Sequence, residues 1–126
     1  QIWILPNERN LPPGYETLVI PPVPRSLGGG GSVVEGSVDS KTLIASPHGR
    51  DGSLTIHQDA EVWLQRLAKG EQATVAPPQG KAAWIQIVSG EVSIATETLK
   101  TGDGAALDET ATLQALSDME CIVFYL

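Results

Sequence analysis

The sequence predicts an all-β protein, built as a sandwich or barrel of short strands, and three observations support this fold class. Short runs rich in Val, Ile, Thr and other apolar residues recur along the chain. Turns containing Gly, Pro, Asn or Asp separate these runs about every ten residues. No window of roughly eleven residues keeps a helical apolar stripe without a Gly or Pro.

In chain order, each expected strand ends at a turn signal. Residues 1–5 form a β-type run that ends at Pro6, and a polar loop follows over residues 7–14. Residues 46–52 form a turn-rich loop. Residues 91–95 alternate polar and apolar side chains, which is the period of a half-buried strand. The other expected strands are residues 42–45, 54–57, 62–67, 72–75, 83–89 (the longest), 97–100, 110–116 and 120–126.

Length and charge limit the possible functions. The chain has 126 residues, enough for one domain with one core over residues 1–126. Eight Lys and Arg against fifteen Asp and Glu give a formal charge of −7. Nucleic acids and anionic membrane surfaces both require a basic footprint, so neither is expected as a partner. No apolar run approaches the length of a membrane span.

The single cysteine, Cys121, lies in an apolar run and has no partner for an internal disulfide. Free cysteines are among the most buried residue types, so we expect an inert, buried thiol. A lone free thiol favours a cytoplasmic location. The sequence shows no signal peptide and no initiator Met, and we therefore expect a fragment or a processed chain.

Residues 17–40 form an atypical loop or linker rich in Pro and Gly. Residues 17–24 are apolar and studded with prolines, and Gly28 to Ser32 read Gly-Gly-Gly-Gly-Ser. Such a block is a flexible coil that cannot pack a core, typical of an engineered linker, with a natural glycine-rich surface loop as the alternative. We therefore expect residues 25–35 to be mobile and weakly packed.

The stretch from Gly70 to Gly90 combines a strand, a Pro-Pro-Gln-Gly corner and a longer strand. Its spacing resembles the first sequence signature of the cupin barrels, in which two histidines and a glutamate lie between two glycines. Gly70 and Gly90 match these glycines. The histidine positions fall on Ala76 and Pro78, and the glutamate position falls on Ala83.

The second cupin signature supplies one more histidine, and the corresponding segment, residues 100–105, places that position at Ala105. A cupin metal needs imidazole nitrogens and a carboxylate as donors. The side chains of Ala and Pro have no lone pairs to offer. The resemblance thus implies a cupin-type jelly-roll β-barrel that is metal-free and has no catalytic or cofactor-binding residues.

The first sixteen residues point to one particular family among the cupins. Residues 1–16 join an Ile-Trp run to a Pro-rich loop ending in Tyr-Glu, similar to the start of the C-terminal half of pirin-like bicupins, the family that includes bacterial quercetin dioxygenases. Residues 43–53, 56–60 and 102–106 also resemble that half. The resemblance covers residues 1–16 and about 41–126, and it implies an N-terminal cupin domain as partner in the parent protein.

Two other groups of residues suggest alternative sites. His48 and His57 are the only histidines, and they would need a third ligand such as Asp59 to hold a metal. A structural His57 and an exposed His48 are the simpler interpretation. The tryptophans are expected to be core or interface anchors, with ligand stacking as the alternative for Trp84. The three tryptophans are Trp3, Trp63 and Trp84.

Three functions of different classes follow. The first is a non-catalytic structural domain that packs on and shapes a catalytic first barrel. The second is a small-molecule-binding barrel whose mouth is lined by Ala76, Pro78 and Ala83. The third, part of a quercetin-dioxygenase-type oxidoreductase, has little support because kinship of fold does not supply a site. The apolar runs 1–5 and 122–126 also predict a homodimer, formed by strand pairing or barrel faces, with a monomer as the alternative.

Overall fold

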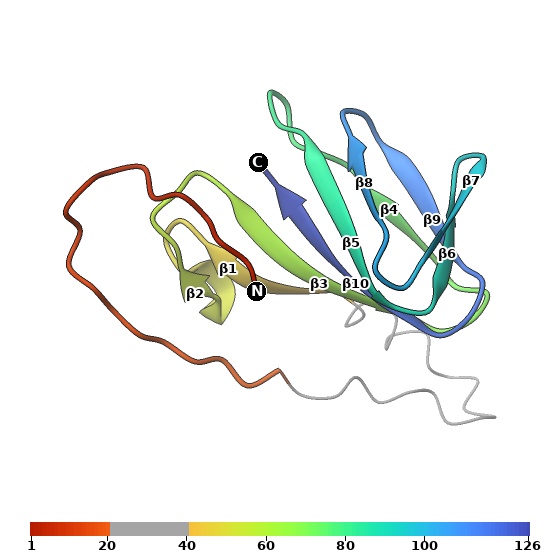
Figure 1. Cartoon of the computed structure of the whole chain (residues 1–126), viewed down its shortest axis with the longest axis horizontal. Coiled ribbons are helices and arrows are strands. Elements are labelled where there is room, and N and C mark those ends of the chain that lie inside the picture. Colours follow the sequence, from red (N-terminus) through yellow and green to blue (C-terminus); the bar gives the residue numbers. More distant parts are fainter. Residues whose placement is uncertain (21–40) are drawn as a thin grey trace.

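The computed structural model of the protein describes residues 1–20 and 41–126. Over that part the chain forms two β-sheets and one short 3-10 turn, η2 (Arg50–Gly52), with no α-helix (Figure 1). The six-stranded sheet has the order β2 (Leu54–Thr55), β1 (Lys41–Ser46), β3 (Glu61–Leu67), β10 (Met119–Tyr125), β5 (Ala83–Ser89) and β8 (Gly104–Leu107). The four-stranded sheet has the order β4 (Gln72–Val75), β9 (Ala111–Ala115), β6 (Glu91–Ile94) and β7 (Glu97–Lys100).

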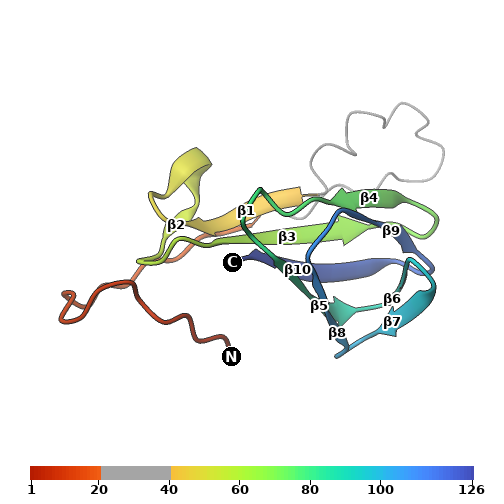
Figure 2. The same ribbon diagram turned by 90° about the horizontal axis from the view of Figure 1, so that it is seen from above.

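All strand pairs are antiparallel except β1 with β2. Figures 1 and 2 place β2, η2 and the N-terminal segment at one end of the molecule, and β4, β6, β7 and β9 at the other. No helix long and apolar enough to cross a membrane is found in the described ranges.

Alternation along the central strands divides the apolar side chains between two faces. On β5, Ile85 and Ile87 are buried against the second sheet, while Trp84 before them and Val88 after them are 40% and 41% exposed. This is the period of two that a strand imposes on its side chains. The buried residues of the interior core are Leu67, Val75, Ala83, Ile85, Ile87, Val92, Ile94, Leu99, Leu113, Ala115, Met119, Cys121, Val123 and Tyr125.

A second, smaller cluster covers the other face of the six-stranded sheet. Its buried members are Ala45, Val62 and Phe124. The partly buried residues around them are Ile4, Ile44, Leu54, Ile56 and Ile122. Because Ile4 belongs to the N-terminal segment, that segment is held partly by apolar contact with this cluster.

The prediction of a strand over residues 1–5 is wrong. The segment has no ladder partner, and its backbone is tied by two single hydrogen bonds, from Asn7 N to the His57 carbonyl (2.6 Å) and from Gln58 Nε2 to the Leu5 carbonyl (2.9 Å). Trp3 is 85% exposed, which excludes the core role among its two expected roles of core or interface anchor. Pro6 has no N–H to donate, which prevents a ladder from continuing past it.

Two further differences concern short strands. Residues 54–57 shorten to β2, a two-residue strand, and β8 was not expected. β8 contains Gly and Ala, which have low strand propensity, and it exists because it pairs with β5.

The closing run 122–126 lies mostly in β10, which is paired on both sides and offers no free edge for strand exchange. The glycine-rich block and the mobility predicted for residues 25–35 lie outside the described residues.

Cys121 is fully buried in the interior core, as predicted. Desolvation, followed by the nearby Glu120 carboxylate, raises the pKa of its thiol to about 12 from an ordinary value of 9.0. The folded protein therefore keeps the thiol neutral at a pH where the unfolded chain ionises it. The stability from this neutral state is fully present below pH 9 and is lost as the pH rises from there towards 12.

We expect the free energy of unfolding to fall by about 1 kcal/mol more between about pH 8 and pH 10 than in a Cys121→Ala variant, since each pH unit of ionisation is worth about 1.4 kcal/mol. Urea unfolding at several pH values measures this difference. The other titrating groups are common to both proteins and cancel. Parallel pH profiles in the two proteins would contradict the burial of a neutral thiol.

Gly90 and Gly102 offer a matched test of packing around the hairpins. Both have φ of +89°, where an L side chain is strained. A Cβ at Gly90 would collide with the backbone of Asp118 and Met119, whereas a Cβ at Gly102 would meet nothing within 4 Å. Gly102→Ala should cost about 1 kcal/mol from backbone strain alone. Gly90→Ala should cost about 1–3 kcal/mol more in urea unfolding, because backbone must shift. Equal losses would contradict this packing.

Candidate functional site

The four positions that correspond to cupin ligands lie around one end of the six-stranded sheet. Ala83 begins β5 and is 2% exposed, and Ala105 on β8 packs against the interior core. Ala76 and Pro78 follow β4 in the exposed corner. β5 and β8 are paired, so Ala83 and Ala105 face the same interior. These side chains carry no donor atoms, and a metal does not fit this set of residues.

Hydrogen-bond register sorts the interior side chains into rows across the sheet. One row contains Ala83, Tyr125 and Glu61, and the next contains Ile85, Val123 and Trp63. Cross-strand partners share a face, so the second row is apolar and the first ends in a carboxylate. The interior near the vacant ligand positions is therefore filled by aliphatic side chains, and its polar groups lie at the β3 edge of the first row.

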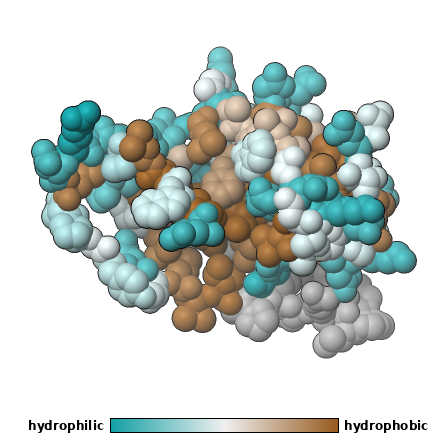
Figure 3. Space-filling model, in the orientation of Figure 1, coloured by the Kyte–Doolittle hydropathy of each residue, from teal (hydrophilic) through white to brown (hydrophobic). Residues whose placement is uncertain are grey.

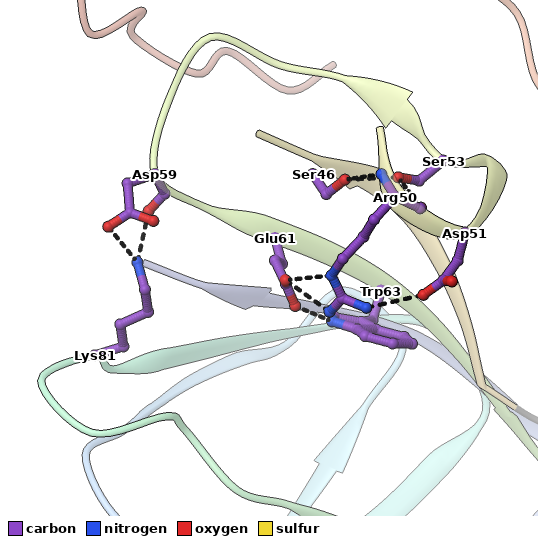
Figure 4. Close-up of polar contacts among 8 residues, drawn as sticks. All are labelled: Ser46, Arg50, Asp51, Ser53, Asp59, Glu61, Trp63 and Lys81. Carbon is purple, nitrogen blue, oxygen red and sulfur yellow. Dashed lines mark hydrogen bonds and ion pairs between the residues drawn. The ribbon is translucent and has the colours of Figure 1, made fainter. Parts of the chain in front are cut away.

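Glu61 is the centre of the polar group at this end (Figure 4). Arg50 Nε and Nη2 donate to Glu61 Oε2 at 3.1 and 2.7 Å, and Trp63 Nε1 donates to Oε1 at 3.0 Å. Arg50 also donates to Asp51 Oδ2 at 2.9 Å. Its guanidinium carbon lies 5.7 Å from the centroid of the Trp63 ring. Glu61 thus has donors on both oxygens.

The pKa values in this group follow from these contacts. Burial acts to raise the pKa of Glu61, but hydrogen bonds from Arg50 and Trp63 and the charges of Arg50 and Lys41 outweigh it, so that the pKa lies below its ordinary value. Burial lowers the pKa of Lys41, against the opposing attraction of Glu61. Burial raises the pKa of Tyr125, against a backbone hydrogen bond with Ala76.

Two sets of contacts hold the surrounding loops. Lys81 Nζ donates to the carbonyl of Asp59 at 2.7 Å and forms an ion pair with its Oδ2 at 3.1 Å, which joins the β2–β3 loop to the corner before β5 (Figure 4). On the other side, the hydroxyls of Ser46 and Ser53 lie 2.7 Å apart, and Ser53 Oγ donates to the Arg50 carbonyl at 2.8 Å. The η2 turn that carries Arg50 is therefore fixed to β1.

The structure brings His48, His57 and Asp59 to one groove of about 920 Å³ between the N-terminal segment and the β1–β3 end. No group of three or more His, Cys, Asp or Glu in residues 1–20 and 41–126 is placed to hold a metal. The alternative metal site from these residues is therefore not formed by the described side chains. His48 is exposed, as expected, and His57 is exposed as well, which does not support the structural role expected for its side chain.

Of the three tryptophans, which were expected to be core or interface anchors, only Trp63 packs against the interior core. Trp63 is half-buried against the interior core, as expected of an anchor. Trp84 points to the outer face, where its ring would meet any side chain at Gly104, and its Nε1 donates to Gln86 Oε1 at 3.3 Å. Trp84 therefore cannot stack on a ligand inside the barrel.

Sequence reasoning missed Lys41, Glu61 and Tyr125 as members of this end of the barrel. A signal was present, because Glu61, Trp63 and Gln65 alternate on one strand and so must share a face. The pairing of β3 with β10, which brings Tyr125 beside Glu61, could not be seen in the sequence.

Comparison with known proteins agrees with this architecture. Residues 43–126 match the family described as the quercetinase C-terminal cupin domain. The quercetin 2,3-dioxygenase of Escherichia coli K12 is 37% identical over 126 residues, covering 98% of this chain and 48% of that protein. A putative quercetin 2,3-dioxygenase of Pasteurella multocida is 33% identical over 116 residues, covering 90% of this chain and 43% of that protein.

Solved structures give the same family. The crystal structure of YhhW from Escherichia coli superposes with a TM-score of 0.82 at 33% identity, covering 98% of this chain and 47% of that one. Bacterial pirin YhhW in complex with nickel(II) gives a TM-score of 0.65 at 40% identity, over 68% of this chain and 38% of that one. The chain spans about half the length of the curated relatives it matches. It belongs to the C-terminal cupin domain family of the pirin-like quercetin dioxygenases, with the cupin jelly-roll fold.

Proposed function

We propose that this chain is a non-catalytic, metal-free cupin domain with a structural and association role. In the parent bicupin it packs against an N-terminal cupin domain, which carries the dioxygenase-type chemistry. The observation that carries the proposal is the replacement of all four ligand positions by Ala76, Pro78, Ala83 and Ala105, none of which can donate to a metal.

The packing of the interior supports the same proposal. Ile85, Ile87 and Val123 are at most 1% exposed in the middle of the sheet, beside Ala83. Around Ala83 the interior is closely packed with aliphatic side chains, which offer no imidazole or carboxylate to bind a metal. The domain is therefore better suited to stability and surface contact than to chemistry.

The outer surface provides the contact in this proposal. Ile2, Trp3 and Leu5 are 56%, 85% and 82% exposed on a segment that only a few hydrogen bonds tie to the rest of the molecule. Figure 3 shows hydrophobic residues gathered in the centre and lower part of one face, among hydrophilic surroundings. Exposed apolar area of this kind favours association with another protein surface.

The curated relatives are about twice as long as this chain, and their other half is a candidate for the partner surface. Without that half, a second copy of the chain is the expected occupant, which gives a homodimer. A cytoplasmic location is part of the proposal, because Cys121 is a free, buried thiol.

Metal analysis tests the metal-free part of the proposal. After incubation with nickel(II) or iron(II) and dialysis, elemental analysis should give far less than one metal ion per chain. A His48→Ala/His57→Ala variant is the matched control and should give the same low value. About one metal ion per chain in the original protein, lost in the variant, would overturn the metal-free assignment.

Light scattering over a dilution series tests association. We expect the mass to rise above the 13.3 kDa of one chain with increasing concentration. Trp3→Ser should weaken the association, because it removes the most exposed tryptophan from the apolar segment. Leu116→Ser, at an exposed site directly after β9 of the four-stranded sheet, should leave it unchanged. A constant mass of one chain at all concentrations would rule out the dimer.

A further inference from the structure

The side chain of Lys41 ends between two aromatic rings at the polar end of the barrel. Its Nζ lies 4.4 Å from the centroid of the Trp63 ring and 5.7 Å from that of Tyr125. Within the described part of the chain, no acceptor or carboxylate lies within bonding distance of this ammonium group. Aromatic faces attract a cation but accept its N–H groups only weakly.

This ammonium group lies close to the vacant ligand positions. Tyr125 is the cross-strand neighbour of Ala83, and its hydroxyl forms a backbone hydrogen bond with Ala76. Lys41 pairs with Gln65 on β3, and its long side chain reaches back over Trp63 towards Tyr125. The ammonium group of Lys41 therefore lies beside the positions that correspond to the metal ligands of other cupins.

Within residues 1–20 and 41–126, no acidic side chain forms an ion pair with Lys41. Glu61 is the acid whose charge acts on Lys41, yet its oxygens accept hydrogen bonds from Arg50 and Trp63. Asp51 is likewise engaged by Arg50. The Lys41 side chain is half-buried, and desolvation exceeds the attraction of Glu61, so its pKa lies below the ordinary value. An anion placed at Nζ would offset that desolvation.

We propose that Lys41, Trp63 and Tyr125 form a binding site for a small, singly charged carboxylate at the mouth of the barrel. The ammonium group donates to the carboxylate, and the half-buried Trp63 ring contacts the apolar part of the ligand, while the buried Tyr125 ring supports Lys41 from below. Glu61 and the net charge of −7 disfavour ligands with two or more negative charges. This site is separate from the structural role proposed above, since a domain can serve both.

Titration with benzoate, followed in ¹H–¹⁵N spectra of the whole chain at low salt, tests the site. The Trp63 indole N–H, identified by its loss in Trp63→Phe, should shift saturably. Lys41→Met should weaken binding by about tenfold or more, the value of a hydrogen bond between charged groups. Lys100→Met, which removes an exposed lysine on β7 of the four-stranded sheet, should bind benzoate as the original protein does.

Ligand charge provides the second comparison. Benzamide has the same shape without the charge and benzylamine has the opposite charge, so both should bind at least about tenfold more weakly than benzoate. Phosphate at a pH where it is a dianion should also bind more weakly. Equal affinity for benzoate and benzamide, or unchanged binding in Lys41→Met, would overturn the proposal.

A further measurement needs no variant and guards against misfolding of Lys41→Met. Saturating benzoate should raise the pKa of Lys41, read from the pH dependence of its side-chain carbon resonances, because a bound anion stabilises the charged form. A pKa of Lys41 that benzoate leaves unchanged would contradict a carboxylate at Nζ, whatever the stability of the variant.

Discussion

Strand β10 pairs over its length with both β3 and β5, and this double pairing determines which side chains enter the barrel. In the observed register Cys121, Val123 and Tyr125 point inward, while Phe124 joins the cluster on the outer face. A shift of one residue would exchange the two sets. The apolar interior and the polar end of the barrel both depend on this register.

The interior shows how the residues at the positions of the cupin ligands are packed. Ala83 and Ala105 occupy little volume and offer no donors, so the space around them is closed by larger aliphatic neighbours such as Ile85 and Val123. Close packing of this kind stabilises the folded state through burial alone. Core packing therefore stabilises the barrel around these positions.

At the end of the barrel that carries Glu61, most charged side chains form ion pairs and hydrogen bonds with one another. Glu61 accepts from Arg50 and Trp63, which holds its pKa low in spite of partial burial. The Arg50 guanidinium is itself positioned by η2, which Ser46 and Ser53 fix to β1. With Glu61 occupied in this way, the positive charge of Lys41 faces the aromatic rings. Because Glu61 is bonded by Arg50 and Trp63, the ammonium group of Lys41 is available for the proposed carboxylate ligand.

The sequence by itself determined the all-β class, most strand positions, the burial of Cys121 and the family, because alternation, turn residues and motif spacing are local features. It also determined that the cupin ligand positions lack donors. Only the tertiary structure decided that residues 1–5 remain outside the sheets, that Trp84 faces outward and that Lys41 reaches Tyr125. These outcomes depend on which strands become neighbours, and strands far apart in the chain are brought together by long-range pairing that no local pattern records.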